Sequence, residues 1–278
     1  MRGNDSIKYQ IFDPTGNITA LVEDEVGVAL QPNVAAAIMR LHQRVEQVGF
    51  VSDSGTQPML RMAGGEFCGN AAMCAAAWHA CRIGLTVGSV TLRVSGASEL
   101  VEVRLKRTDD GGYRASVHMP HARAIEELEM TYGGLRDVVP LVRMEGISHI
   151  VIEQTSALWR LRDCRADAEQ AVRAWCDSLD VDGLGLMFVE GEGEHRSLVP
   201  LVYVPVSGTM FWENSCASGS AAVGRYVAAL EGAESSLWLE EPGGTLFVQS
   251  QPGDGETWLT GHASKVSAHV IPRRACIA

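Results

Sequence analysis

The fold of this chain is decided by Gly65-Glu66-Phe67-Cys68-Gly69-Asn70-Ala71-Ala72-Met73, a stretch whose pattern recurs as Trp212-Glu213-Asn214-Ser215-Cys216-Ala217-Ser218-Gly219-Ser220. In both stretches a cysteine at a turn is followed by small and hydrogen-bonding residues, and then by an Ala-rich run that is typical of a helix. The sequence predicts these helices at 70–81 and 217–230. Their small side chains make them thin enough to be enclosed by a curved sheet, with a cysteine at each N-terminus.

The repeat continues beyond the two cysteines. Gly96 lies 28 residues after Cys68, Gly244 lies 28 residues after Cys216, and a strand-like run follows each glycine. This common spacing indicates an internal duplication with a period of 148 residues, which is the separation of the two cysteines. We expect two similar halves, with their active groups facing across the junction.

Two glycines interrupt the second small-residue helix, at Gly219 and Gly224. A glycine inside a helix costs about 1 kcal/mol relative to alanine. Close packing of the helix backbone against a neighbouring element would justify that cost.

Hydrophobic periodicity predicts the remaining elements. Apolar residues at Val34, Ile38, Leu41, Val45 and Val48 form one face of a helix that has Pro32 in its first turn. A second amphipathic helix is predicted at 168–179. The predicted strands are a hairpin of 7–12 and 18–23, then 47–52, 58–62, 89–95, 100–106, 113–119, 147–153, 186–189 and 199–204, with a hairpin tip at 191–194.

Length and composition restrict the class of protein. The chain has 278 residues, 46% of them hydrophobic, which fits one large globular domain or two of ordinary size. The net charge of -11 argues against a nucleic-acid partner. The N-terminal residues lack the apolar region of a signal peptide and no run is long enough to span a membrane, so we expect a cytoplasmic protein whose seven cysteines are free thiols.

A cysteine at a helix N-terminus lies close to unpaired N–H groups and to the positive end of the helix dipole. These should move its pKa towards neutrality. Two such thiols facing one pocket cannot easily both ionise, so one thiolate and one thiol are expected. That pair suits a two-base racemase, in which one sulfur removes the α-proton of an amino acid and the other protonates the opposite face. The alternative is that each cysteine is only a small buried hydrophobe.

The two cysteine motifs resemble those of the diaminopimelate epimerase family of cofactor-independent amino-acid racemases. The likeness covers the whole chain and includes Gly16-Asn17, Gln47, His149 and Pro242-Gly243-Gly244. It implies an α/β (α+β) fold with two pseudo-symmetric halves, each a curved sheet or barrel around a central helix. The implied halves are residues 1–120, to which the strand at 264–278 returns, and residues 121–263.

The resemblance also implies roles for residues at the matching positions. Cys68 and Cys216 are then the acid/base pair, and His149 and Glu213 help to relay protons at the thiols. On the residues alone, a single histidine in a strand is more commonly a satisfied core residue than a catalyst. Asn17 then only shapes its turn, and Glu213 is an exposed or capping carboxylate. The residues expected to bind the substrate, through side chains or helix-end amides, are Asn17, Gln47, Gly69, Asn70, Asn214, Ala217 and Ser218.

Departures from the family pattern bear on the substrate. Met62, Ile147, Gly185 and Asn214 stand where diaminopimelate epimerases carry the Asn and Arg residues that hold the distal end of their substrate. A distal carboxylate would lose its cationic partner here, so diaminopimelate is a poor substrate. The motifs look closest to those of the histidine racemases of metallophore biosynthesis. Ala217 replaces the glycine that is usual in that subgroup, and its methyl group crowds the carboxylate site.

No cofactor and no metal are expected. The lysines at 8, 106 and 265 are far from the motifs, so none suits a pyridoxal phosphate Schiff base. Three other functions stay open: a racemase or epimerase of another amino acid in the same fold, a redox protein in which the two thiols form a disulfide, and an amino-acid-binding protein without turnover. The family resemblance suggests a homodimer that acts on a small-molecule substrate.

Overall fold

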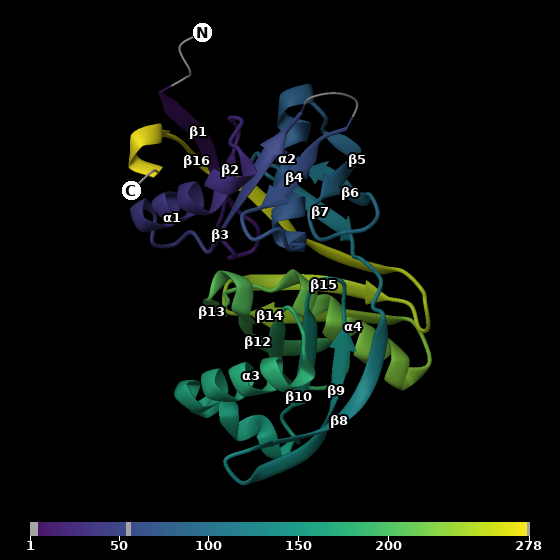
Figure 1. Cartoon of the computed structure of the whole chain (residues 1–278). Helices are drawn as coiled ribbons and strands as arrows, with labels where there is room; N and C mark the ends of the chain where they lie inside the picture. Colours follow the sequence, from purple (N-terminus) through teal and green to yellow (C-terminus); the bar gives the residue numbers. More distant parts are fainter. Residues whose placement is uncertain (1–4, 54–56, 277–278) are drawn as a thin grey trace. The chain divides into compact units, whose positions relative to one another are not determined.

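A computed structural model describes residues 5–53 and 57–276 of the chain (Figure 1). The chain divides into two compact units, residues 1–118 with 260–278 (unit 1) and residues 119–259 (unit 2). Residues 1–4, on which part of the expectation about a signal peptide rests, lie outside the described residues. Residues 277 and 278 of the segment expected to return to the first half do so as well.

The described residues of unit 1 form two α-helices and the strands of one barrel. Its elements are β1 (Ser6–Asp13), β2 (Thr19–Val22), η1 (Val28–Leu30), α1 (Gln31–Leu41), β3 (Gln47–Ser52), β4 (Met59–Met62), α2 (Gly69–Ile83), β5 (Val87–Val94), β6 (Val101–Arg107), β7 (Tyr113–His118), β16 (Thr257–Pro272, which begins in unit 2) and η4 (Arg273–Cys276).

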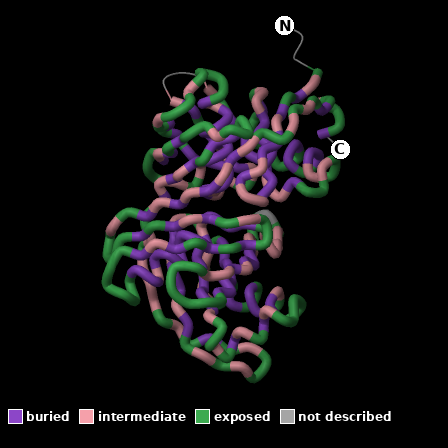
Figure 2. The backbone as a smooth tube through the Cα atoms, turned by 180° about the vertical axis from the view of Figure 1, so that it is seen from behind, coloured by how far each residue is buried: buried purple, intermediate pink, exposed green. Residues whose placement is uncertain are grey.

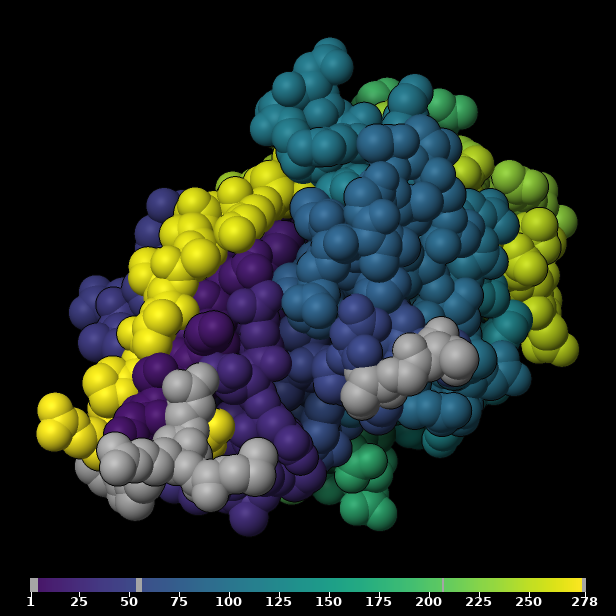
Figure 3. All heavy atoms as spheres, turned by 90° about the horizontal axis from the view of Figure 1, so that it is seen from above, coloured from purple at the N-terminus to yellow at the C-terminus, as the bar shows by residue number. Residues whose placement is uncertain are grey.

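The strands of unit 1 close on themselves. Their order is β1-β2-β3-β4-β5-β6-β7-β16, and β16 also pairs antiparallel with β1, from Ser6 opposite Pro272 to Asp13 opposite Ser264. Figure 3 shows the result, with the yellow C-terminal segment lying along the purple N-terminal one. The sheet therefore has no open edge here, because the last strand of the chain pairs with the first.

Helix α2 is the central element of unit 1. It packs against β2, β4, β5, β6 and β7, and the side chains of its alanines at 71, 72, 75, 76, 77 and 80 are buried. The helix begins after Cys68 and ends at Gly84, whose φ of 71° is the left-handed conformation common at a helix C-terminus. The small side chains let one helix fit within a barrel of eight strands, as predicted.

Unit 2 has the same kinds of element. They are β8 (Ala124–Tyr132), β9 (Leu135–Arg143), β10 (Ser148–Glu153), η2 (Ala157–Asp163), α3 (Arg165–Leu179), β11 (Leu184–Glu190), β12 (His195–Val204), η3 (Pro205–Ser207), β13 (Thr209–Trp212), α4 (Ala217–Glu231), β14 (Ser235–Glu241) and β15 (Gly244–Ser250). The strand order is β15-β14-β12-β11-β10-β9-β8, and β13 pairs with β12. Helix α4 packs against β9, β10, β11, β14 and β15.

The two units repeat one series of strand pairings. In unit 1, β2 and β3 are parallel, β3 and β4 antiparallel, and β4 and β5 parallel. In unit 2, β10 and β11 are parallel, β11 and β12 antiparallel, and β12 and β14 parallel. Each parallel pair is joined through a helix, α1 or α2 in unit 1 and α3 or α4 in unit 2, as a parallel connection requires. This pairing is that of two pseudo-symmetric halves, and the predicted fold class is confirmed.

Buried residues gather inside each unit, and the exposed ones follow its turns and outer faces (Figure 2). Helix α1 covers the outer side of its sheet through Val34 and Ile38, which pack with residues of β1, β2 and β3. Helix α3 does the same in unit 2 through Val172 and Trp175. Each sheet is thus covered by a small-residue helix on one face and by an amphipathic helix on the other.

Two differences from the sequence predictions have local causes. The helix predicted through Val45 and Val48 ends at Leu41, which is 62% exposed. Val45 and Val48 are buried from a turn and from β3 instead, so their spacing matched a helix by coincidence. The hairpin β8–β9 lies in a stretch where no element was predicted, and its signal is the alternation of Leu128, Met130 and Tyr132 with polar residues.

Candidate active site

Cys68 is the N-cap residue of α2, as predicted. Its backbone is extended (φ -138°, ψ 114°), and its sulfur accepts a hydrogen bond from the Ala71 N–H at 3.4 Å. Gly69 and Asn70 form the first turn of the helix and are buried. Their amides occupy N1 and N2, where a helix offers no carbonyl acceptor.

A hydrogen-bonded series connects Cys68 to the start of the chain. The Cys68 thiol donates to Gln47 Oε1 at 3.0 Å. Gln47 Nε2 in turn donates to Asn17 Oδ1 and, at 2.9 Å, to Thr19 Oγ1. Strands β2 and β3 are parallel neighbours with Thr19 opposite Gln47, so the sheet register brings these groups together. Three residues predicted from the sequence, Asn17, Gln47 and Cys68, therefore share one network.

Thr19 and Glu46 belong to this network and were missed by the sequence analysis. Thr19 is fully buried, and Asn17 Nδ2 donates to Glu46 Oε2 at 3.1 Å. A polar residue at the start of an apolar strand is a weak signal. Glu46, as the neighbour of Gln47, could have been inferred only from the strand register.

The turn after β5 supports the Cys68 loop. Ser95 Oγ donates to the carbonyl of Glu66 at 2.9 Å. Gly96 has a φ of 74°, and a Cβ there would overlap the Phe67 backbone. This glycine of the sequence repeat is thus explained by a close approach of two backbones.

Cys216 occupies the matching position in unit 2. It is the N-cap residue of α4 (φ -125°, ψ 100°), and its sulfur accepts from the Gly219 N–H at 3.3 Å. Ala217 and Ser218 follow at N1 and N2. The predicted close packing of the internal glycines is confirmed, because a Cβ at Gly219 would overlap Met187 Sδ and one at Gly224 would lie 2.5 Å from Val248.

The expected acidification of Cys216 is wrong. Burial raises the pKa of its thiol well above the ordinary value, and the charges of Glu213 and Glu241 raise it further, against weaker contributions from Ser218 and Gly219. The helix dipole is worth at most about 2 kcal/mol, whereas full burial can shift a pKa by about 3–5 units. Desolvation therefore outweighs the dipole, and Cys216 holds its proton.

His149 lies within reach of Cys216 through one hydroxyl. Its Nε2 is 3.0 Å from Ser218 Oγ, which is 3.6 Å from Cys216 Sγ. Burial lowers the pKa of His149 to about 3, so the ring is neutral at neutral pH. Its Nδ1 has no hydrogen-bond partner within the described chain, which favours the tautomer with the proton on Nε2. A neutral imidazole then donates to Ser218, whose own proton is left to point at the sulfur.

His149 also makes a testable contribution to acid stability. Its pKa is about 3 in the folded chain, whereas the ordinary pKa of histidine is 6.5, so the unfolded state binds one more proton between these values. The contribution of His149 to the free energy of unfolding should therefore fall as the pH falls from 7 to 5, by up to about 1.4 kcal/mol per pH unit. Glu241, whose pKa is raised to about 8, contributes a slope of the opposite sign over this range. His149→Gln should remove the first contribution and so change the net slope, measured by urea unfolding at each pH.

The matched control is His121→Gln, which removes an exposed histidine from the same unit. It should leave the contribution of the buried His149 ring to the slope in place. Equal slopes for His149→Gln and the wild type would contradict the assignment of a neutral, buried imidazole.

Gly185 leaves room for the His149 ring. A Cβ at that position would overlap His149 Nδ1. Of the other positions that depart from the diaminopimelate pattern, Met62 is fully buried, Ile147 is half-buried and Asn214 is exposed. Glu213 is half-buried, and its N–H donates to the Pro200 carbonyl at 3.0 Å.

Glu241 is a buried carboxyl group that the sequence analysis missed. Its Oε2 accepts from the Cys216 N–H at 2.7 Å and its Oε1 accepts from Ser220 Oγ at 2.5 Å. Burial raises its pKa to about 8. The adjoining Pro242-Gly243-Gly244 was recognised, and the Gly243 N–H donates to the Asn214 carbonyl at 2.8 Å. The signal that could have found Glu241 is its place directly before that turn.

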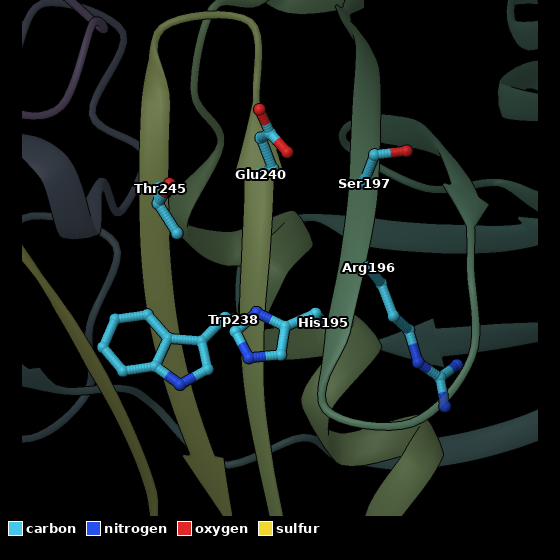
Figure 4. A pocket seen from close by; sticks show the side chains of 6 residues that line it. All are labelled: His195, Arg196, Ser197, Trp238, Glu240 and Thr245. Atoms are coloured by element: carbon cyan, nitrogen blue, oxygen red, sulfur yellow. The ribbon is translucent and has the colours of Figure 1, made fainter.

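A surface hollow elsewhere in unit 2 contains none of the predicted site residues. It measures about 200 Å³ and lies over β12, β14 and β15 (Figure 4). The rings of His195 and Trp238 stack at its wall, with centroids 6.3 Å apart. Its lining residues are His195, Arg196, Ser197, Trp238, Glu240 and Thr245.

Two further findings concern the described residues as a whole. Within 5–53 and 57–276, no three His, Cys, Asp or Glu side chains are grouped as a metal site would need. No helix in this part of the chain is both long and apolar enough to cross a membrane.

Comparison with known proteins extends over most of the chain. The family model described as "Histidine racemase CntK N-terminal domain" matches residues 6–267. A histidine racemase of Fusobacterium nucleatum is 30% identical over 256 residues, covering 87% of this chain and 90% of the relative. A histidine racemase of Staphylococcus aureus is 28% identical over 254 residues, covering 88% and 89%.

Solved structures share the fold at much lower identity. A PhzF-family phenazine biosynthesis protein of Bacillus anthracis superposes with a TM-score of 0.67 at 13% identity, covering 96% of this chain and 99% of that one. A hydroxyproline epimerase of Agrobacterium vitis gives 0.65 at 12% identity, covering 98% and 94%. The match of the family model to nearly the whole sequence, on a fold with a cysteine at the start of each central helix, shows that this chain belongs to the histidine racemase family of amino-acid isomerases.

Proposed function

We propose that this protein interconverts L- and D-histidine without a cofactor, through Cys68 and Cys216 acting from opposite faces of the α-carbon. The observation that carries the proposal is the repeated geometry of the two thiols. Each is the N-cap residue of the small-residue helix at the centre of its unit, and each sulfur accepts a hydrogen bond from the third amide of that helix. Membership of the histidine racemase family supports the reaction.

In this mechanism the two thiols have unequal resting states. Cys216 keeps its proton because it is buried among Glu213 and Glu241. In one direction, Cys68 first releases to solvent the thiol proton that it directs at Gln47, then takes the α-proton as a thiolate, and Cys216 protonates the opposite face. The reverse reaction starts from the other protonation state and uses the same groups in exchanged roles. His149 remains neutral and acts through the Ser218 hydroxyl, which orients a proton towards Cys216.

The helix amides give the charge stabilisation that the step needs. The N–H groups of Gly69, Asn70, Ala217 and Ser218 stand at the N1 and N2 positions of α2 and α4. We assign them to the substrate carboxylate and to the negative charge that develops on it during proton removal. Asn17, Gln47 and Asn214 complete the proposed binding site, with Gln47 also holding the Cys68 thiol.

The choice of histidine rests on the relatives and on the charge of the site. Both relatives described above are named histidine racemases. The charge of Glu213 near Cys216 opposes a second carboxylate on the substrate, whereas an imidazole side chain carries no negative charge. We further propose a homodimer in the cytoplasm, where a reducing environment suits seven free cysteines.

The test is an NMR survey of the common amino acids in heavy water, with a reductant and without pyridoxal phosphate. Loss of the α-proton signal of histidine, with formation of its enantiomer, is the expected result. An amino-acid-binding protein would leave every α-proton in place. Exchange restricted to a different amino acid would retain the mechanism and overturn the substrate.

A further inference from the structure

Glu241 lies behind the second thiol and directs both carboxyl oxygens at the start of α4. It ends β14 and is 4% exposed. One oxygen accepts from the backbone of Cys216 and the other from the side chain of Ser220, one turn further along. We propose that Glu241 is the positioning residue that fixes Cys216 at the N-terminus of α4 and places a carboxyl group beside its thiol.

The hydrogen bond from the Cys216 N–H to Glu241 takes the place of a local capping interaction, although the two residues are far apart in the sequence. In a capping box, the side chain of the third helical residue reaches back to the N-cap N–H. In α4 that third residue is Gly219, which has no side chain, and a larger residue there would overlap Met187. The carboxyl group of Glu241, 25 residues from Cys216 in the chain, satisfies the N-cap amide in its place.

A second hydrogen bond, from the turn after β14, makes the placement of Cys216 rigid. The Gly243 N–H donates to the carbonyl of Asn214, so the β14–β15 turn holds the cysteine loop on both sides of Ser215. The carboxyl group of Glu241 is buried, and a movement of Cys216 would leave these carboxyl oxygens without their hydrogen-bond donors. Loss of such a partner is costly inside a protein, and the thiol is therefore held in one position.

The charge of Glu241 raises the pKa of the Cys216 thiol. The ionisable groups that face Cys216 are Glu213 from the preceding loop, Glu241 from β14, and the neutral His149 of β10 through Ser218. Two anions so close oppose each other's ionisation, so the pair releases its protons in two coupled steps. Burial and the charge of Glu213 raise the pKa of Glu241, while its hydrogen bonds from Ser220 and Cys216 lower it by less.

The first thiol has no corresponding carboxyl group at the repeat position. The residue 148 places before Glu241 is Arg93, which is exposed. The Cys68 thiol instead donates a hydrogen bond to Gln47 Oε1. Glu241 thus adds to the difference between the two thiols, of which the burial of Cys216 is the largest cause. This inference rests on the proposed function only for its catalytic meaning, because the position and protonation of Cys216 can be measured without turnover.

The experiment is a pH titration of the protein labelled with ¹³Cβ-cysteine, in which the NMR shift reports thiol or thiolate. The Cys216 signal is assigned with Cys216→Ser. Glu241→Gln should lower the midpoint of Cys216 by about one pH unit, which is tenfold more thiolate at a pH below the midpoint. The matched control is Glu240→Gln, which removes an exposed carboxylate one residue away and should leave the midpoint unchanged. A wild-type midpoint in a folded Glu241→Gln protein would overturn the proposal.

A reciprocal measurement keeps the test independent of how well Glu241→Gln folds. In ¹³Cδ-glutamate-labelled protein, the carboxyl signal with the highest midpoint is expected to be that of Glu241. The Cys216 thiol still holds its proton when Glu241 ionises, so the Glu241 midpoint is expected near 8 both in the wild type and in Cys216→Ser. A Glu241 midpoint in the ordinary range of glutamate would show that this carboxyl group is not held buried against Cys216, and would also overturn the proposal. Neither result depends on histidine, so failure of the racemase proposal would be seen separately in the heavy-water survey.

Discussion

Replacing Cys68 or Cys216 by serine is expected to lower the racemisation rate by roughly 10³-fold or more, since each variant loses one of two acid/base groups. A serine hydroxyl keeps the size of the side chain and the hydrogen bond from the helix amide. Its pKa, however, is far too high for it to exchange a proton with the α-carbon near neutral pH. The rate is measured by polarimetry or by chiral chromatography of histidine.

Two other cysteines provide matched controls. Cys81 and Cys164 are exposed, one in each unit, and Cys81→Ser and Cys164→Ser should racemise at the wild-type rate. The single catalytic variants should still exchange the α-proton of one enantiomer slowly, because one thiol remains. Wild-type racemisation by either Cys68→Ser or Cys216→Ser would show that the two-thiol mechanism is wrong.

Gly219→Ala adds only one methyl group, yet it is expected to lower the racemisation rate by about 10²-fold. Its new methyl group would overlap Met187 Sδ and lie 3.1 Å from Cys216 Sγ. The thioether of Met187 can yield, but the sulfur of Cys216 accepts a hydrogen bond from the Gly219 N–H, and the Cys216 backbone N–H is held by Glu241. A displacement of about 1 Å in a catalytic group costs on the order of 10²-fold in rate. The rate at saturating histidine is the measurement.

Gly224→Ala separates this effect from a loss of stability. It lies in the same helix, and its Cβ would be 2.5 Å from Val248 Cγ1 and 2.8 Å from Ser250 Oγ, away from the thiol. Overpacking costs about 1–3 kcal/mol in either variant, so both should unfold at lower urea concentration. At urea concentrations below the unfolding transition, Gly219→Ala should have lost most of its activity, whereas Gly224→Ala should not. Equal activities of the two folded variants would contradict the placement of Gly219 against the reacting sulfur.

The sequence predicted the central helices because their signal is local. A run of alanines after a cysteine turn specifies both a helix and its thin cross-section, whatever surrounds it. The duplication followed from two motifs with equal spacing to a later glycine. The structure explains one of these glycines, Gly96, by its positive φ and the backbone against it. The helix after Pro32 was predicted too long, because a spacing of three and four residues does not show where a chain stops being helical.

The polar partners of the thiols could be predicted only in part. Asn17 and Gln47 were identified by resemblance, but Thr19 joins them because β2 and β3 align in parallel register. The direction of the Cys216 pKa was mistaken for a similar reason. The helix dipole can be inferred from a motif, whereas burial and the charges of Glu213 and Glu241 come from residues that the fold brings together.

By itself, the sequence determined two thin helices, each with a cysteine at its N-terminus, and a repeat that places them in equivalent halves. Those properties depend on side-chain size and on spacing along the chain, which a sequence states directly. Only the tertiary structure decided that the two thiols differ. Cys68 donates to a carboxamide from a neighbouring strand, while Cys216 is desolvated and its amide is held by Glu241. Proton affinity depends on the distance to other charges and to water, and only the folded chain fixes those distances.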